Sequence, residues 1–445
     1  MWDGFEGFPL RKDYHEPYYE EEHKPFGTRW DQGHHTIAED RNPWHDNVKY
    51  PANFDAPNYK PQRDQIRTVG IEEARASKLR TDRLVVNIGP QHPSTHGVLR
   101  LRVTLDGETV LAADPVLGYL HRNHEKIGER NTYIQNMPFT DRLDYLTSMS
   151  NNLAYAITVE KLMGLKVPER AEYVRVIMNE LTRFISHLAL VGFFYSDLGA
   201  YFTPVLYGLE ERELVLDLFE AASGSRMMCN YMRFGGLTRD LPDGWLDTCR
   251  DLVLNRFPRV VDEFETYLVH NELFNARAKG VGIVPRDVAI NYSAAGPVLR
   301  ASGVKYDVRK ADPYSIYNRF DFDIPFRTSG DTFDRFVLRL EEMRQSLKIL
   351  KQALEQIPQG EIQTGKKNYQ VRVPKGDVYG RAENPKGELG FYVVSDGSPN
   401  PYRYHVRSPA FINLGMLNEM ASGYKLQDLI IILGAIDLTM GEVDR

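Results

Sequence analysis

The feature that most constrains the fold is a long amphipathic stretch at residues 168–195. Its apolar side chains recur at helical spacing and fall on one face: these are Val174, Ile177, Leu181, Phe184, Ile185 and Leu188. A stripe of this period and length predicts a helix that buries one face against other helices. The same periodicity predicts helices at 141–162, 206–223, 244–270 and 331–357, the last with Asp331 as its N-cap. The core is therefore predicted to be a helical bundle.

Short strand-like runs lie at both ends of the helical region: these are 84–86, 98–105, 109–111, 389–395 and 402–407. Asp-Gly pairs at 106–107 and 396–397 separate neighbouring runs and are typical of hairpin turns. The predicted fold class is α+β, a mainly helical bundle with small antiparallel sheets. We expect one domain over 81–445, made of a small sheet (81–125), the bundle (126–357) and a C-terminal α/β part (358–445).

The first 80 residues have a different character. They are rich in aromatic, Pro, His and charged residues and show no periodicity. Such a segment cannot easily bury a core of its own. Residues 1–80 are therefore either a disordered extension or an extended arm that becomes ordered on a neighbouring protein, and the many aromatic side chains favour the arm.

Composition excludes several classes of protein. The formal net charge of −6 argues against a general nucleic-acid binder. The chain has only 2 Cys, Cys229 and Cys249, whereas an iron–sulfur cluster needs about four thiolates. No apolar run reaches the roughly 18–20 residues of a membrane span, and the best one, 429–433, is predicted to be a buried strand or core helix. Because no secretory signal begins the sequence, we expect a soluble chain that reaches any membrane through partner proteins.

The densest polar cluster is at residues 89–97, with the sequence GPQHPSTHG. Two His four residues apart suit a metal ion when they share a helix, but Pro93 indicates a loop and no acidic residue lies between the two. A metal site is thus the least favoured reading, and two others stay open beside it. His92 and His96 either tie down a turn through hydrogen bonds, or belong to an active loop in which His donates a proton near neutral pH.

Three other polar segments interrupt the helical region. Residues 118–126 and 141–145 are densely charged, which is typical of helix caps and solvated faces. Asp197 differs because the residues before it are mainly apolar. An unpaired buried carboxylate is costly, so Asp197 needs a partner, and a protonated His is the natural one.

Residues 89–100 resemble the signature of the 49-kDa subunit of respiratory complex I. Further motifs of that family follow in order: GYLHR at 118–122, DRLDY at 141–145, DLGA at 197–200, LRASG at 299–303, EMRQS at 342–346 and GEVDR at 441–445. The resemblance extends from about residue 84 to the last residue. It implies a fold similar to the large subunit of nickel–iron hydrogenases. The nickel site is absent, since residues 437–440 contain no Cys where hydrogenases carry a pair, and no metal is expected.

The resemblance also implies a function. The chain would be a subunit of a proton-pumping NADH:quinone oxidoreductase and would form the site for the quinone head group. His96 and Tyr145 would donate hydrogen bonds to the quinone oxygens, and Asp197 would pair with His96 and keep it charged. Further residues implied at the site are His92 and Arg100 beside the quinone loop, and Arg122, Arg226 and Met228 near a partner's cluster.

The implied partners are other subunits of the same complex. A 20-kDa (NuoB-type) subunit would hold the [4Fe–4S] cluster that passes electrons to quinone, so this chain alone would bind no cofactor. A 30-kDa (NuoC-type) subunit, a ferredoxin-like (NuoI-type) subunit and a membrane (NuoH-type) subunit would adjoin it. Residues 4–13 resemble the end of the 30-kDa subunit, which favours packing of the arm on that partner. The implied location is the peripheral arm, at the cytoplasmic face of the bacterial inner membrane.

The sequence departs from the family pattern at three places. Met228 stands where the family usually has His, so a pH-dependent cluster potential is in doubt, and Asn123 stands where Gly is usual. The segment 363–386 is shorter than in the family, which puts the contacts of that surface in doubt.

Three alternatives stay open. The chain could serve a related membrane complex with a ferredoxin or F420H₂ electron donor, because the electron-input module lies in other subunits. It could be a soluble His-based metalloenzyme, although no acidic third ligand accompanies His92 and His96. It could also be a structural assembly subunit without chemistry of its own.

Overall fold

The computed structural model describes residues 83–90, 97–200, 203–365 and 371–445. The chain forms two compact units. Within the described ranges, the first unit contains 83–87, 102–114 and 417–429, and the second contains 88–101, 115–416 and 430–445. The arm expected over residues 1–80 lies outside the described residues.

The first unit is built on a three-stranded sheet. Its strands β1 (Arg83–Ile88), β2 (Arg100–Asp106) and β3 (Thr109–Val116) lie in the order β1-β2-β3. Side chains of β2 alternate between half-buried and buried, as expected for a strand with one face on a core. A backbone bond from Gly423 N to Val110 O (2.8 Å) ties the 417–429 segment to β3. The predicted N-terminal strands are therefore confirmed.

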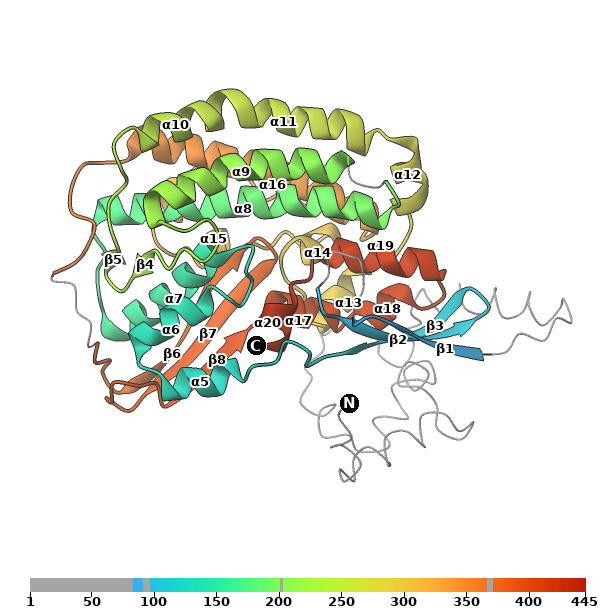
Figure 1. Ribbon diagram of the computed structural model, residues 1–445, viewed down its shortest axis with the longest axis horizontal. Coiled ribbons are helices and arrows are strands. Elements are labelled where there is room, and N and C mark those ends of the chain that lie inside the picture. The colour runs from blue at the N-terminus through green and yellow to red at the C-terminus, as the bar shows by residue number, and fades with distance from the viewer. Residues whose placement is uncertain (1–82, 91–96, 201–202, 366–370) are drawn as a thin grey trace, which may run out of the picture. The chain divides into compact units, whose positions relative to one another are not determined.

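The second unit contains a layer of long helices (Figure 1). Helices α8 (Glu169–Asp197), α9 (Thr203–Ser223) and α16 (Thr332–Gln356) pack side by side. Asp331 caps α16, as predicted, by accepting a hydrogen bond from the backbone N–H of Asp334 (2.8 Å). The helical pattern predicted at 244–270 is also confirmed, as the run of α10 (Trp245–Asp251), η2 (Leu252–Arg256), α11 (Phe257–Phe264) and η3 (Glu265–Val269).

A second three-stranded sheet lies against these helices through α7 (Ser148–Met163) (Figure 1). Its antiparallel strands are β6 (Gly376–Asn384), β7 (Gly387–Ser395) and β8 (Arg403–Arg407), in that order. The helix approaches closely, because a Cβ on Gly380 would lie 2.2 Å from Thr158 Oγ1. The last two strands were predicted, and β6 was missed.

One expectation from the sequence needs correction. The helix predicted at 141–162 begins only at Ser148, because residues 141–147 form a non-helical turn between α6 (Tyr133–Thr140) and α7. Residues 429–433, predicted to be a buried strand or a core helix, lie in helix α19 (Leu426–Ile436), which confirms the helix alternative.

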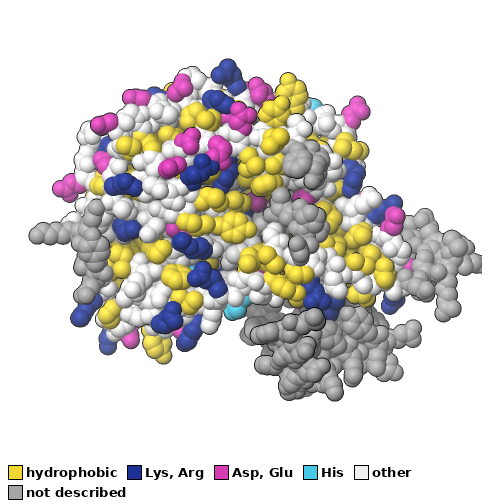
Figure 2. All heavy atoms as spheres, viewed as in Figure 1, with side chains coloured by type: hydrophobic (Ala, Val, Ile, Leu, Met, Phe, Trp, Pro, Cys, Tyr) yellow, Lys and Arg dark blue, Asp and Glu magenta, His cyan; other side chains and the backbone are white. Residues whose placement is uncertain are grey.

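The remaining elements are short. They are α5 (His124–Arg130), β4 (Met232–Arg233), β5 (Gly236–Leu237), α12 (Glu272–Ala278), α13 (Arg286–Asn291), α14 (Gly296–Ala301), α15 (Val308–Ala311), η4 (Tyr317–Arg319), α17 (Pro409–Leu414), α18 (Leu417–Ala421) and α20 (Met440–Asp444). Among the described residues, no helix is long and apolar enough to cross a membrane. On the face shown in Figure 2, acidic side chains gather mainly over the long helices.

Candidate functional site

A cavity of about 210 Å³ lies in the second unit. It is formed by the turn after α6, the last turns of α8, and the end of α19 with the residues that follow it. The lining residues are Tyr145, Leu146, Leu190, Phe193, Phe194, Asp197, Gly434, Asp437, Leu438 and Thr439. Two of the three side chains predicted to carry chemistry, Tyr145 and Asp197, thus share one cavity with mainly apolar walls.

Tyr145 is held by the turn that replaces the predicted helix. The Asp144 carboxylate accepts a hydrogen bond from the backbone N–H of Leu146 (3.1 Å) and so fixes this turn. Gly441 of α20 packs against the turn, since a Cβ there would lie 2.5 Å from Leu143 O. The phenol is half-buried, and burial raises the pKa of Tyr145, which keeps the hydroxyl protonated as a hydrogen-bond donor.

The loop that carries His92 and His96 lies largely outside the described residues, and so do both side chains. Gly97, the next residue, is described. A Cβ on Gly97 would lie 3.6 Å from the hydroxyl oxygen of Tyr145 and 3.6 Å from Met440 Cγ. The backbone at Gly97 therefore lies next to the Tyr145 hydroxyl.

Asp197 is the last residue of α8. A Cβ at Gly434 on α19 would lie 2.4 Å from Asp197 Oδ2 and 3.5 Å from a ring carbon of Phe194. Only a residue without a side chain fits there, so Gly434 allows α19 to pass directly over the Asp197 carboxylate.

Near Tyr145, four buried charged side chains and one hydroxyl meet in what we call the Lys386 cluster: Asp144, Lys386, Asp437, Glu442 and Thr439. Lys386 Nζ lies 3.0 Å from Asp144 Oδ2 and 3.8 Å from Asp437 Oδ1, and it donates a hydrogen bond to Thr439 Oγ1. These carboxylates raise the pKa of Lys386 against the opposing effect of burial, so the ammonium stays charged.

Glu442 is the unusual member of the Lys386 cluster. Burial, reinforced by the charges of Asp144 and Asp437, raises its pKa to about 8. Neither carboxylate oxygen makes a well-formed hydrogen bond within the described residues, although the backbone N–H of Ala410 interacts weakly and favours the charged form. Three carboxylates surround one ammonium, so Glu442 holds a proton at neutral pH.

A second buried cluster, which we call the Arg300–Arg309 network, connects helices α8, α14, α15 and α16 with strand β6. Its ion pairs are Arg300–Glu342 (2.7 Å), Arg300–Glu383 (2.8 Å), Arg309–Asp307 (2.7 Å), Arg309–Glu180 (3.1 Å) and Arg183–Glu180 (3.4 Å). Hydroxyl groups of Tyr317 and Ser346 also donate to Glu180, each at 2.7 Å. His187 Nε2 lies 3.0 Å from Glu342 Oε2, and burial lowers the pKa of His187, so the neutral ring donates this bond.

The other predicted site residues are more dispersed. Arg100 bonds the hydroxyl of Tyr119 (3.4 Å), and the Arg122 guanidinium lies 5.0 Å from the ring centroid of Phe139. Arg226 is exposed and pairs with Glu213, while Met228 is half-buried. None of these side chains lines the cavity at Tyr145.

The polar segment at 118–124 is tied to α20. Both carboxylate oxygens of Asp444 accept backbone hydrogen bonds there, from Gly118 (2.9 Å) and Leu120 (2.7 Å). His121 Nδ1 lies 2.6 Å from the backbone oxygen of Asp444, and His124 N donates to Arg445 O (3.1 Å). These residues are therefore held by structural contacts.

Comparison with known proteins gives a consistent picture. The family model of the respiratory-chain NADH dehydrogenase 49-kDa subunit matches residues 197–445. The D-type subunit (form 1) of the NADH-quinone oxidoreductase of Roseiflexus sp. is 56% identical over 374 residues, which cover 82% of this chain and 100% of that protein. The chain belongs to the 49-kDa subunit family.

Two more members show the same extent of similarity. The corresponding D-type protein (form 2) of Herpetosiphon aurantiacus is 55% identical over 370 residues, and that of Dehalococcoides mccartyi is 56% identical over 367 residues. In both cases the alignment covers 82% of this chain and all of the relative. As a 49-kDa family member, the chain is a subunit of a multi-subunit NADH-quinone oxidoreductase.

Sequence reasoning missed the Lys386 cluster, whose charged side chains are buried beside the cavity. Asp144 and Glu442 lie in motifs of the 49-kDa family, but the motifs alone indicate no role for either. Lys386 follows Pro385 in a segment without periodicity, and nothing in its neighbourhood marks it as buried. Within the described ranges, no group of three or more His, Cys, Asp or Glu side chains is arranged to hold a metal ion.

Proposed function

We propose that the cavity between Tyr145 and Asp197 receives the head group of a quinone. The observation that carries this proposal is the geometry. A protonated phenol and a carboxylate from distant segments converge on a small space with apolar walls, and the backbone at Gly97 adjoins the phenol. Apolar walls with a few polar groups suit a flat ring that carries two carbonyl oxygens.

In this proposal, Tyr145 donates a hydrogen bond to one quinone oxygen and His96 donates to the other. Reduction of a quinone to a quinol takes up two electrons and two protons and places negative charge on the oxygens. Preorganised donors stabilise that charge as it develops. Asp197 pairs with His96 and keeps the imidazole charged, so the ring is able to supply a proton.

The Lys386 cluster supports Tyr145 in this role. The Lys386 charge opposes the effect of burial on the pKa of Tyr145, so it favours the phenolate left behind when the hydroxyl gives up its proton. Glu442 holds a proton next to Asp144 and Lys386 at neutral pH. When the charge at Tyr145 changes, the cluster is thus able to release the proton of Glu442 or to move it to a neighbouring carboxylate.

The remaining proposed roles depend on partner subunits. A 20-kDa subunit holds the [4Fe–4S] cluster that supplies the electrons, with Arg122, Arg226 and Met228 on the side that faces it. His92 and Arg100 adjoin the quinone loop. The ferredoxin-like and membrane subunits complete the surroundings, and the chain lies in the peripheral arm at the cytoplasmic face of the bacterial inner membrane.

Asp197→Asn tests the pairing with His96. The amide keeps the shape of the side chain but removes the charge that keeps the imidazole protonated. Quinone reductase turnover of the intact complex is expected to fall, most strongly at higher pH, where an unsupported imidazole loses its proton. Asp217→Asn on the exposed side of α9 is the matched control. Unchanged turnover at every pH with Asp197→Asn would remove this role.

We also propose that residues 1–80 pack on the 30-kDa subunit. The support is the resemblance of residues 4–13 to the end of that subunit. Deletion of residues 1–60 is expected to lower the amount of the 30-kDa subunit retained during purification. Full retention, measured by quantitative mass spectrometry of the purified complex, would contradict the proposal.

A further inference from the structure

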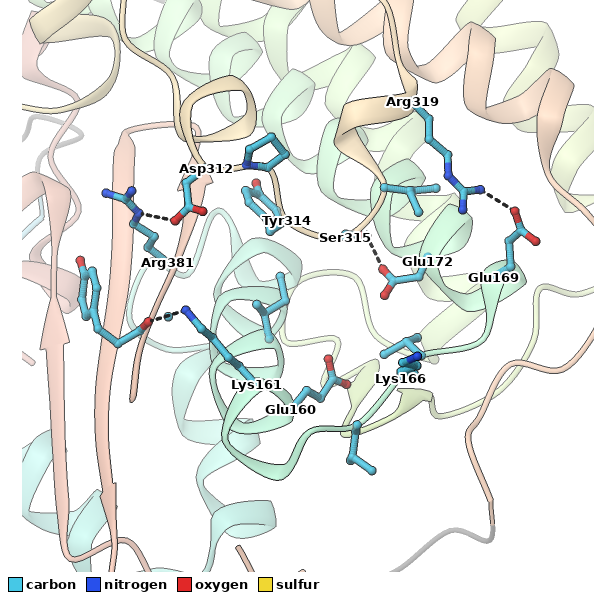
Figure 3. Close-up of a pocket in the computed structure, with 17 residues that line it drawn as sticks. Glu160, Lys161, Lys166, Glu169, Glu172, Asp312, Tyr314, Ser315, Arg319 and Arg381 are labelled. Atoms are coloured by element: carbon cyan, nitrogen blue, oxygen red, sulfur yellow. Dashed lines mark hydrogen bonds and ion pairs between the residues drawn. The ribbon is translucent and has the colours of Figure 1, made fainter. Parts of the chain in front are cut away.

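A second cleft, of about 620 Å³, lies elsewhere in the same unit (Figure 3). It is bounded by the C-terminal end of α7, the start of α8, the loop 312–316 and strand β6. It shares no lining residue with the cavity at Tyr145. Nothing in the proposed quinone chemistry uses this cleft.

The wall formed by β6 is an open sheet edge. Among the strands that the structure describes, β6 pairs only with β7, and an antiparallel strand directs the backbone groups of alternate residues toward and away from its neighbour. Glu383 is directed away from β7, because its N–H donates to Tyr314 Oη (3.2 Å) and its carbonyl oxygen accepts from Arg183 (2.6 Å). Two-residue alternation then directs Arg381 and Tyr379 away as well.

The β7–β8 pairing gives the same result. Tyr402 N donates to Val394 O (2.8 Å), so Val394 is directed toward β8, and so is Tyr392 two residues earlier. Tyr379 is the β6 partner of Tyr392 in the ladder. Its backbone groups therefore point away from β7, into the cleft.

This edge has few backbone partners at Tyr379 and Arg381. Lys161 Nζ donates to the carbonyl oxygen of Tyr379 at 3.4 Å, as Figure 3 shows. The N–H of Tyr379 and both backbone groups of Arg381 make no other hydrogen bond within the described residues. Unpaired edge groups of this kind are a template for an added strand.

Three of the four carboxylates that line the cleft form close ion pairs, and the fourth does not. Three carboxylates meet a guanidinium within hydrogen-bond distance: the pairs are Glu160–Arg175, Glu169–Arg319 and Asp312–Arg381. Among the described residues, Glu172 has no ion pair within 4 Å and accepts only the hydroxyl of Ser315. Ser315 adopts a left-handed backbone (φ 52°), which is costly for a residue other than Gly and here accompanies that bond.

Glu172 is half-buried on the floor of the cleft and is oriented toward its interior (Figure 3). Burial raises the pKa of Glu172, so its carboxylate is in an unfavourable position without a cation. Within the described part of the chain, the cleft thus lacks two things. It lacks backbone partners for the β6 edge and a cation within 4 Å of Glu172, on which Arg175 and Arg319 act only from farther away.

We propose that the cleft binds an extended peptide segment of a partner subunit, which pairs with the outer edge of β6 and places a Lys or Arg side chain on Glu172. Main-chain hydrogen bonds to Tyr379 and Arg381 give affinity in such an added strand, and the side-chain pocket gives specificity. The ammonium groups of Lys161 and Lys166 at the rim suit carbonyl oxygens of the segment.

Site-specific cross-linking in the purified, fully assembled complex tests this inference. A photoreactive residue is placed at position 166, which is exposed and lines the cleft, and at position 351 on the exposed side of α16 as a control. We expect position 166 to cross-link to one segment of another subunit that contains Lys or Arg. Position 351 is not expected to label that segment.

Two further substitutions test the two contacts separately. Glu172→Gln removes the charge, and Arg381→Pro removes the N–H that the segment would bond, whereas Arg381→Ala keeps it. Proline is tolerated at an edge position whose N–H is outside the ladder. The cross-link from position 166 is expected to fall roughly tenfold with Glu172→Gln and with Arg381→Pro, since a hydrogen bond to a charged group or a lost backbone bond has about this effect. Arg381→Ala is expected to retain it.

The inference is overturned if position 166 cross-links to no other subunit, if it labels only this chain, or if the yield is unchanged by either Glu172→Gln or Arg381→Pro. Quinone reductase activity is measured in the same preparations and is expected to be normal. The quinone site is tested at Tyr145, so failure at this cleft leaves the proposed chemistry untouched.

Discussion

The two buried charge clusters of the second unit differ in the ratio of carboxylates to cations. In the Arg300–Arg309 network, four carboxylates meet three guanidiniums, and several carboxylate oxygens accept additional hydrogen bonds. In the Lys386 cluster, three carboxylates surround one ammonium, and Glu442 is left with a pKa of about 8.

The difference in balance indicates a difference in role. Neighbouring guanidiniums hold the pKa of Asp307 at about 2 and lower that of Glu342, so these two groups keep their charges at physiological pH, whereas burial raises the pKa of Glu383. Such a network holds helices in register. The Lys386 cluster adjoins the cavity at Tyr145 and contains a group that titrates near neutral pH, which is the property expected of a site that handles protons.

The largest effect is expected for Arg309→Met. The substitution leaves Asp307 and Glu180 buried without their main cation. Removing one partner of a buried pair typically costs about 3–5 kcal/mol. We expect the complex to accumulate poorly, as measured by the amount of this chain in purified membranes. Normal accumulation and an unchanged melting temperature would mean that the network does not stabilise the fold.

A smaller effect is expected for Lys386→Met, because the carboxylates around it are able to take up protons. We expect a loss of about 2–3 kcal/mol at pH 8 and a clearly smaller loss at pH 6, since protonation neutralises the remaining charges. Thermal unfolding of the complex across this pH range measures the difference, with Lys351→Met as the exposed control. A loss of stability that does not depend on pH would mean that the Lys386 cluster, like the Arg300–Arg309 network, keeps fixed charges.

Gly434→Ala tests the close approach of α19 to Asp197. A methyl group there would lie 2.4 Å from the carboxylate oxygen, so either the helix or Asp197 has to move. Overpacking of this kind costs about 1–3 kcal/mol. We expect quinone reductase turnover to fall by more than stability alone explains, because Asp197 is displaced. Gly415→Ala, where the nearest atom would be 3.1 Å away, is the milder comparison, and equal turnover in the two variants would contradict the account.

The smallest effect at a single pH is expected for Glu442→Gln at pH 5, within about 1 kcal/mol. In the wild type, the pKa of Glu442 is raised in the folded state, so the unfolded chain loses this proton first as the pH rises. Stability therefore falls between about pH 4.5 and pH 8, by at most about 1.4 kcal/mol per pH unit. The Gln variant lacks this fall, so it should become the more stable protein toward pH 8. Parallel pH profiles of thermal unfolding would refute the assignment of a proton to Glu442.

The sequence predicts the parts of the fold that rest on long periodic patterns. Helices α8 and α16 are predictable because their apolar stripes extend over many turns. Strand β6 was missed because GDVYGRAEN is rich in Gly and charged residues, and its stability comes from pairing with β7 and contact with α7. The turn at 141–147 was mistaken for helix because its apolar residues happen to continue the helical spacing.

The candidate site follows the same rule. Tyr145 and Asp197 are identifiable because they lie in motifs of the 49-kDa family. The Lys386 cluster was not found, because Lys386 and Asp144 are far apart in sequence and a Lys in a non-periodic segment usually lies on the surface. Local patterns report local structure, whereas a buried ion pair is a property of the tertiary fold.

The most direct test of the central claim is the quinone reductase activity of the intact complex with Tyr145→Phe. This change removes one hydroxyl and keeps the ring, so assembly and iron–sulfur signals are expected to persist. Loss of one preorganised donor predicts a fall in turnover of about a hundredfold. Turnover equal to that of the wild type, in a fully assembled complex, would contradict the placement of the quinone head group at Tyr145.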